Sequence, residues 1–264
     1  MKGRHMQGYW TDFKAPDFLG LPERTIAILP LGATEQHGPH LPVSVDSDLA
    51  SAVADRSRAH WHPETSALIL PTLTITKSNE HSAHPGTLCL SADTLLAVLR
   101  DLGDSLARTG ISRLAMLNGH GGNTAVLEIA CREMRLAHSM ITAHGSWFGF
   151  AEWDGVVDPE DAAHDLHGGD TETSPMLAVS PDRVDMSKAQ NFRSKGRGWQ
   201  ESGRWIGLNG QAMRPGWVID DLNAFGACGD ASVATAEKGE VLLGSAARNF
   251  AGFLREFAQF DPAT

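Results

Sequence analysis

The chain has 264 residues, of which 42% are hydrophobic and 20% charged, a composition typical of a globular protein with a full core. Its 32 acidic and 22 basic residues give a formal net charge of -10, which excludes a general basic surface for nucleic acid or anionic lipid. The 3 cysteines are too few and too scattered for a thiolate metal site, and no apolar run is long enough to cross a bilayer. We therefore expect one domain, residues 1–264, in a cytoplasmic protein that binds neither nucleic acid nor a membrane.

Short apolar runs alternate along the chain with longer amphipathic segments. The runs have strand length and end at Gly, Asn or Pro, and they span 25–31, 66–71, 112–117 and 139–144. The segments with helical spacing span 47–58, 91–109, 123–136 and 231–257. This alternation predicts a three-layer α/β/α domain with a mostly parallel central sheet. Ligands of such domains bind at the carboxyl ends of the strands, so the residues after each strand are the first candidates for a site.

Residues 196–229 are rich in Gly and Trp and show no clear period. The segment is either a long loop packed on its own aromatic side chains, or a lid or subunit contact, since long ordered loops are usually functional.

The first predicted strand leads into the segment GATEQHGPHLP at residues 32–42. In extended chain, Glu35 and His37 project to the same side, and Asp46 follows just before a helical pattern. One imidazole and two carboxylates with no nearby cation are ligands expected for Zn, Mn or Fe rather than for Mg alone. Taken singly, each residue could be a surface or capping group, with Asp46 as a helix N-cap. His40 is expected to pack or to support the site.

The third predicted strand ends in NGHGGN at residues 118–123, where glycines on both sides of His120 let the backbone approach a ligand closely. The string almost forms a dinucleotide fingerprint, but Thr124 stands where the last glycine belongs. The next strand also lacks the acidic residue that would hold a ribose. A nucleotide-dependent oxidoreductase is therefore disfavoured.

Two further segments carry candidate site residues. In HGGDTETSP at residues 167–175, Pro175 in a first helical turn and Ser174 as its cap would place Glu172 just ahead of a helix over 176–179. Glu172 beside His167 could complete a second metal site or exchange protons with substrate, although a capped helix after an acidic loop is the alternative. After the second strand, three polar residues are candidates for substrate contacts, or else form an ordinary polar loop: Ser78, Glu80 and His81.

These segments, together with HPGT at residues 84–87, resemble the creatininase (creatinine amidohydrolase) family. The resemblance covers residues 24 to 245, and the strings TEQHGPHLP and NGHGGN in this order are highly specific. It implies a three-layer α/β amidohydrolase, commonly a homo-oligomer with six subunits, in which one aspartate bridges two divalent metal ions. The chain resembles the branch with NGHGGN rather than creatininase proper.

The resemblance also implies roles by position. Glu35, Asp46 and His120 would hold one metal, and His37 and Asp46 the other. His167 matches the substrate-side catalytic histidine, and Glu172 the acid that follows it. Creatininase proper has Tyr-Glu in place of Gly121-Gly122, and this glutamate binds the second metal, so we expect Glu172 to supply the carboxylate here. Ala163 replaces a tryptophan that packs on creatinine.

The chemistry implied is hydrolysis of an amide carbon-nitrogen bond by a metal-bridging hydroxide, because two cations (Zn, Mn or Fe) lower the pKa of water from about 15.7 toward 7. His167 would stabilise the oxyanion or protonate the leaving nitrogen. The expected substrate is a small cyclic or linear amide with a non-peptide bond. The alternatives are a deformylase, a hydrolase that trims a small modified peptide, and a non-catalytic binding module that keeps the fold.

Overall fold

The computed structural model describes residues 5–208 and 211–263. Its central sheet has five strands in the order β1-β3-β2-β4-β5, and all neighbouring strands pair in parallel. The strands are β1 (Gln7–Tyr9), β2 (Ile26–Leu31), β3 (Ala67–Ile69), β4 (Arg113–Asn118) and β5 (Ile141–Ser146). The predicted parallel α/β sheet is confirmed, and β1 is an additional edge strand that the apolar runs did not reveal.

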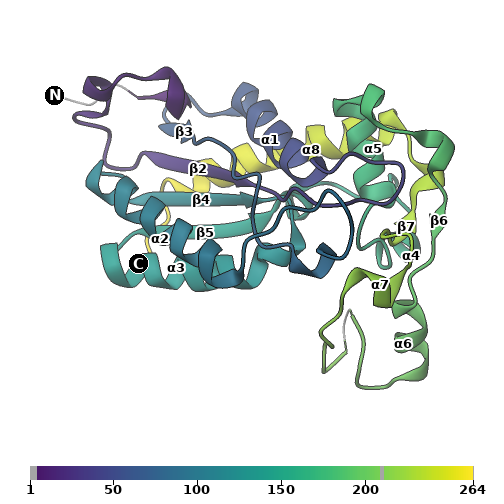
Figure 1. Ribbon diagram of the computed structural model, residues 1–264. Helices are drawn as coiled ribbons and strands as arrows, with labels where there is room; N and C mark the ends of the chain where they lie inside the picture. The colour runs from purple at the N-terminus through teal and green to yellow at the C-terminus, as the bar shows by residue number, and fades with distance from the viewer. Residues whose placement is uncertain (1–4, 209–210, 264) are drawn as a thin grey trace.

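Helices cover both faces of this sheet (Figure 1). One face carries α1 (Val45–Ser57) and α8 (Ala236–Phe257), and the other carries α2 (Ala92–Arg108) and α3 (Thr124–His138). Successive residues of β2 enter the two cores in turn, as the two-residue repeat of a strand requires: Ile26 and Ile28 pack on the side of α1, and Ala27 and Leu29 on the side of α2. A strand buried on both faces is apolar throughout, which is why it was recognisable in the sequence.

Two predicted boundaries shift for local reasons. Strand β5 begins two residues later than expected because Ser139 ends α3 in the left-handed conformation, with φ of 54°. Helix α8 begins at Ala236 rather than at residue 231, because residues 231–233 form a 3-10 turn and the Thr235 side chain accepts a hydrogen bond from the Lys238 amide.

The prediction that a helix starts at Pro175 was wrong. Helix α5 (Asp170–Val179) begins at Asp170, with Gly169 as N-cap, and Pro175 lies inside it. Ser174 is not the cap: its hydroxyl donates to Asp170 Oδ1. Proline removes one helical N–H bond, but this short, buried helix packs along α8, and tertiary packing outweighs local propensity. Glu172 is therefore in the first turn of α5, not ahead of it.

The Gly/Trp-rich segment contains two short helices, α6 (Gly196–Ser202) and α7 (Ile219–Leu222), and the strand β7 (Gly229–Asp230), which pairs with β6 (Asn191–Phe192). Helix α4 (Pro159–Ala162) precedes it. Part of the segment packs on its own aromatic residues, since Trp199 and Trp217 contact a small apolar cluster around Leu222.

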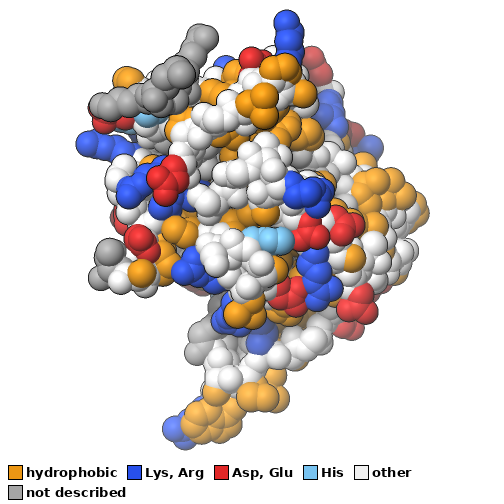
Figure 2. All heavy atoms as spheres, turned by 90° about the vertical axis from the view of Figure 1, so that its left-hand side faces the viewer, with side chains coloured by type: hydrophobic (Ala, Val, Ile, Leu, Met, Phe, Trp, Pro, Cys, Tyr) orange, Lys and Arg blue, Asp and Glu red, His pale blue; other side chains and the backbone are white. Residues whose placement is uncertain are grey.

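Residues 203–208 and 211–225, which we call the arm, project from the body of the molecule (Figure 1). In Figure 2 the arm is the lowest part of the molecule, and hydrophobic side chains gather there. The large apolar side chains exposed on it are Trp205, Ile206, Met213, Val218 and Phe225. No helix of the described residues has the length and apolarity needed to span a membrane.

Candidate metal centre

The predicted ligands meet at the carboxyl edge of the sheet. Glu35 and His37 follow β2, and His120 follows β4, the strand paired with it, so that the register brings Leu31 beside Asn118. The segment containing His81 follows β3, the neighbour of β2 on the other side. Parallel strands that end side by side explain why segments far apart in the sequence share one site.

Asp46 enters the site from the first turn of α1, and two glycines allow it to do so. A Cβ atom on Gly32 would lie 2.3 Å from the Ser47 backbone nitrogen, and one on Gly119 would lie 2.2 Å from the Asp46 carbonyl oxygen. Real Cβ atoms do not approach backbone this closely. The absence of side chains at these two strand ends thus lets α1 lie directly against the sheet edge.

Asp46 lies between two imidazoles. Its Oδ1 is 3.2 Å from His37 Nε2, and its Oδ2 is 3.3 Å from His120 Nδ1. Glu35 Oε1 lies 3.2 Å from His120 Nδ1, and Glu172 Oε2 lies 3.6 Å from His37 Nε2. Two groups result, each with potential ligand atoms within 4.8 Å of one another: Glu35, Asp46 and His120, and His37, Asp46 and Glu172. Asp46 belongs to both.

The donor set fits a pair of divalent cations. Glu35 Oε1 and Asp46 Oδ2 are buried and accept no hydrogen bond within the described part of the chain, an arrangement that is unfavourable unless a cation offsets it. The Nδ1–H of His37 donates to the Glu35 carbonyl at 3.0 Å, and the Nε2–H of His120 donates to the Lys77 carbonyl at 2.9 Å. In the neutral rings, the nitrogen that faces the carboxylates is therefore free to ligate.

Burial and neighbouring charges shift the pKa values of the candidate ligands when no metal is bound. Burial opposes a charged His37, but Asp46 and Glu172 beside it outweigh burial and raise its pKa to about 10. Burial raises the pKa of Glu172 to about 8, against the opposing effect of His37. Burial also acts on Asp46, yet His37 and His120 hold the pKa of this carboxyl well below its usual value. Asp46 is thus the carboxylate that stays ionised.

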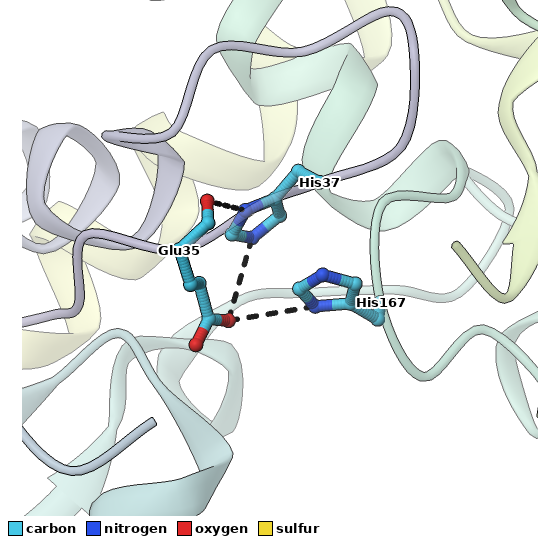
Figure 3. Close-up of side chains that lie close together, drawn as sticks. All are labelled: Glu35, His37 and His167. Carbon is cyan, nitrogen blue, oxygen red and sulfur yellow. Dashed lines mark hydrogen bonds and ion pairs between the residues drawn. The ribbon is translucent and has the colours of Figure 1, made fainter. Parts of the chain in front are cut away.

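His167 completes a third group with Glu35 and His37. The His167 and His37 rings approach the Glu35 carboxylate from different segments (Figure 3). His167 Nδ1 lies 3.6 Å from Glu35 Oε1, and its Nε2–H donates to the Gln36 carbonyl at 2.6 Å. Glu172 is held nearby, since its Oε2 accepts a hydrogen bond from the Gly168 amide at 2.6 Å. The predicted pair of His167 and Glu172 therefore does lie beside the ligand cluster.

A cavity of about 980 Å³ opens onto these residues. Among the predicted substrate contacts, Glu80 and His81 line the cavity together with His167. Ser78 is not among the lining residues: its hydroxyl donates to Glu35 Oε2, so it contacts a candidate ligand instead. Its assignment to substrate binding stays a prediction.

The cavity walls that come from the arm and from the segment after β5 were not predicted from the sequence. Arg214 and Trp217 of the arm line the cavity, as do Phe148 and Trp153. These residues carry no local pattern that identifies them. Gln36 was also not predicted as a site residue. Its side-chain Nε2 lies 2.9 Å from His81 Nδ1 and 3.3 Å from His167 Nε2.

Gly122 occupies the position at which the resemblance to creatininase proper implies a glutamate. A Cβ atom here would lie 2.1 Å from Glu80 Oε1 and 2.3 Å from His120 Nε2. The space is thus used by Glu80, whose other carboxylate oxygen pairs with Lys77 Nζ at 2.6 Å. Glu80 Oε1 lies 3.6 Å from His120 Nε2, on the ring edge opposite the candidate ligand atom.

A sequence model of the creatininase family, described as creatinine amidohydrolase, matches residues 10–254. The chain belongs to the creatininase family. Creatinine amidohydrolase of Pseudomonas putida is 30% identical to this chain over an alignment of 274 residues. The alignment covers 96% of this chain and 95% of that enzyme. A crystal structure of creatinine amidohydrolase superimposes with a TM-score of 0.75 at 27% identity and covers 96% of this chain and 98% of that one.

Relatives with another name are also similar. The mycofactocin precursor peptide peptidase of Mycobacterium tuberculosis is 33% identical over 218 residues, 80% of this chain and 77% of that protein. The protein of the same name from Mycobacterium ulcerans is 35% identical over 162 residues, which cover 60% of this chain and 59% of that protein. Other similar creatininase structures are of a Zn-Zn type and a Mn form. As a family member, the chain is a hydrolase of carbon-nitrogen bonds, as predicted.

Proposed function

We propose that this chain is a metal-dependent amidohydrolase with two divalent ions, Zn, Mn or Fe, per chain. The observation that carries the proposal is that the two oxygens of Asp46 face two different imidazoles. One ion would be held by Glu35, Asp46 and His120, and the other by His37, Asp46 and Glu172. Bound there, the ions would lower the pKa of water and polarise a substrate carbonyl.

His167 is the proposed proton carrier. Its Nε2–H is used by the Gln36 carbonyl, so Nδ1 faces the site without a proton and can accept one. As the water oxygen bonds to the amide carbon, the released proton passes to His167 Nδ1. The same proton then goes to the leaving nitrogen as the carbon-nitrogen bond breaks. Glu172 is a candidate both for ligation and for this proton path.

The preferred substrate is a small cyclic or linear amide. A second candidate is a larger amide, either a small modified peptide that is trimmed or a formamide. The cavity supports this second candidate, because about 980 Å³ is at the upper end of ordinary ligand pockets. Relatives named peptide peptidase support it as well. A turnover screen of metal-loaded protein against creatinine, other cyclic amides, formamides and short peptides separates the two.

Elemental analysis of the purified protein tests the metal centre. We expect about two ions per chain in the wild type and a loss of most of them in Asp46→Asn. Asp48→Asn is the matched control, because Asp48 lies on the same turn of α1 but pairs with Arg183 outside the site. Retention of both ions in Asp46→Asn would contradict the bridging role.

We further infer a single domain over residues 1–264 in a cytoplasmic homo-oligomer, with a hexamer as the expectation. Three free cysteines support a reducing compartment. The apolar side chains exposed on the arm support an interface between subunits. Sedimentation equilibrium of the wild type and of Trp205→Ser would test the assembly, since a smaller assembly in the variant is expected if the arm forms the contact.

A further inference from the structure

Four imidazole rings converge on one buried oxygen, Glu35 Oε1. The nearest nitrogens belong to His120 at 3.2 Å, His167 at 3.6 Å, His81 at 3.8 Å and His37 at 3.9 Å. Each ring has its second nitrogen bonded to another group, and the chemistry of that group decides where the hydrogen of the neutral ring lies.

Three of the rings have a main-chain carbonyl at the far nitrogen. A carbonyl oxygen only accepts, so the far nitrogen of His37, His120 and His167 must carry the hydrogen. In the neutral form, the nitrogen that each of these rings presents to the site is therefore without a hydrogen. Such a nitrogen can ligate a metal or accept a proton, but it cannot donate.

His81 is different, because its far nitrogen contacts the side-chain amide of Gln36. The orientation of this amide is fixed: Oε1 accepts from the Gly38 amide at 3.0 Å, and Nε2 donates to the Gly226 carbonyl at 2.7 Å. Exchanging the oxygen and the nitrogen would break both bonds. The second hydrogen of Gln36 Nε2 is directed at His81 Nδ1, 2.9 Å away. His81 Nδ1 must therefore accept.

The remaining contact of Gln36 does not change this result. Its Nε2 also lies 3.3 Å from His167 Nε2, but both amide hydrogens already have shorter bonds. His167 Nε2 itself donates to the Gln36 carbonyl at 2.6 Å. His81 is consequently the ring of the four that presents an N–H to the site, through Nε2.

We propose that His81 is a further catalytic residue, whose Nε2–H donates a hydrogen bond to the amide oxygen as that oxygen becomes negative, and that Gln36 is the positioning residue that keeps the hydrogen there. When water adds, the carbonyl electron pair moves to this oxygen, and no proton leaves His81. His81 lines the cavity and is itself buried. The inference rests on the proposed function. It gives the two histidines different roles: His167 accepts a proton, and His81 donates a hydrogen bond.

The hydrogen position can be observed directly. In Zn-loaded protein labelled with ¹⁵N-histidine, the His81 resonances are assigned by their loss in His81→Gln. We expect His81 Nε2 to carry the hydrogen and Nδ1 to show the shift of an unprotonated nitrogen. In Gln36→Glu, whose carboxylate only accepts, the hydrogen should move to Nδ1. A wild-type His81 with its hydrogen on Nδ1 would overturn the proposal.

Binding of inorganic phosphate, a tetrahedral anion, to the Zn-loaded protein tests the donor function. In His81→Asn the new side-chain amide lies where Nδ1 lies in histidine and keeps a partner for Gln36. In His81→Gln the amide lies where Nε2 lies. We expect His81→Asn to weaken phosphate binding by about tenfold or more, as for loss of one hydrogen bond to a charged group, and His81→Gln to stay near wild type.

Zinc content separates this inference from the proposed function. Both His81 variants should retain about two zinc ions per chain. A wild type that takes up no zinc would contradict the metal-dependent function itself. Normal zinc content with equal phosphate affinity in His81→Asn and His81→Gln would overturn only the role of His81.

Discussion

Nδ1 of His120 lies 3.3 Å from Oδ2 of Asp46, while the opposite nitrogen of the same ring donates to the Lys77 carbonyl. The backbone of the segment after β3 thus orients the ring. Outer partners of this kind fix the tautomer of a ligating histidine and direct its free nitrogen. A backbone hydrogen bond therefore directs the candidate ligand nitrogen of His120 at the carboxylate of Asp46.

Metal binding should release protons. His37, with a pKa raised to about 10, is protonated near neutral pH in the metal-free protein and must lose this proton to ligate. Metal affinity should accordingly rise with pH between about 6 and 9, by about tenfold per pH unit for each proton released. Zinc titrations by calorimetry, in buffers that differ in ionisation enthalpy, count the protons. Binding without proton release would contradict the arrangement described.

Gly122→Ala should damage the site, whereas Gly121→Ala should not. The added methyl group at residue 122 would collide with His120 Nε2, which is held in place by the Lys77 carbonyl. At Gly121, one residue away, a Cβ atom meets nothing within 4 Å. We expect Gly122→Ala to lose about half of its metal, the ion near His120, as measured by elemental analysis. Equal metal content in the two variants would show that the loop accommodates the methyl group.

His40 should make the protein sensitive to acid. Its ring is buried, contacts Thr173 Oγ1 at 3.0 Å and stacks on Phe192, and burial lowers its pKa from 6.5 to about 4. Because the unfolded chain binds the proton more readily, the free energy of unfolding should fall as pH drops from 6.5 toward 4. The loss is at most about 3 kcal/mol.

Urea unfolding of metal-free protein between pH 4 and 7 measures this effect. His40→Gln, which keeps a partner for Thr173, should show a flatter pH dependence than the wild type. His60→Gln is the control, because His60 is exposed and should leave the dependence unchanged. Parallel curves for wild type and His40→Gln would contradict the assignment.

Arg214 should select substrates that carry a carboxylate. It lines the cavity, and no carboxylate pairs with it among residues 5–208 and 211–263, whereas Lys77, the other basic residue of the lining, pairs with Glu80. We expect Arg214→Ala to raise KM about tenfold for N-acyl amino acids with little change in kcat, as for an exposed charged hydrogen bond. The corresponding C-terminal amides serve as the control, and an equal rise in KM for both would exclude charge recognition.

Sequence patterns predicted well the strands whose residues are buried on both faces of the sheet. Strands β2 and β4 are buried on both faces, so their apolar runs were unambiguous. The start of α5 was misplaced because Pro175 normally opens a helix, and only contacts with α8 explain its interior position. Strand β1 has three residues at a sheet edge, too few for any repeat to be visible.

Glu35, His37 and His120 could be predicted because they follow strands, where topology alone brings Glu35 and His120 together. Asp46 and Glu172 lie in the first turns of helices, and their roles came from the resemblance to the family. The cavity walls could not be predicted in this way. Trp217 reaches the cavity through the path of the arm, and its ring packs edge-on against His81 with centroids 6.4 Å apart. The role of Gln36 depends on bonds to residues as distant in sequence as Gly226. Such contacts have no counterpart in local spacing.

The close approach of Gly32 and Gly119 to the start of α1 also bears on how new activities could arise on this scaffold. Asp46 is placed by backbone contacts between a helix and the ends of two strands, so the candidate ligand framework cannot be exchanged without rebuilding the core. The arm contributes Arg214 and Trp217 to the cavity but supplies none of the candidate ligands. Grafting arms from other family members should therefore change which amides are accepted while the metal stoichiometry stays the same.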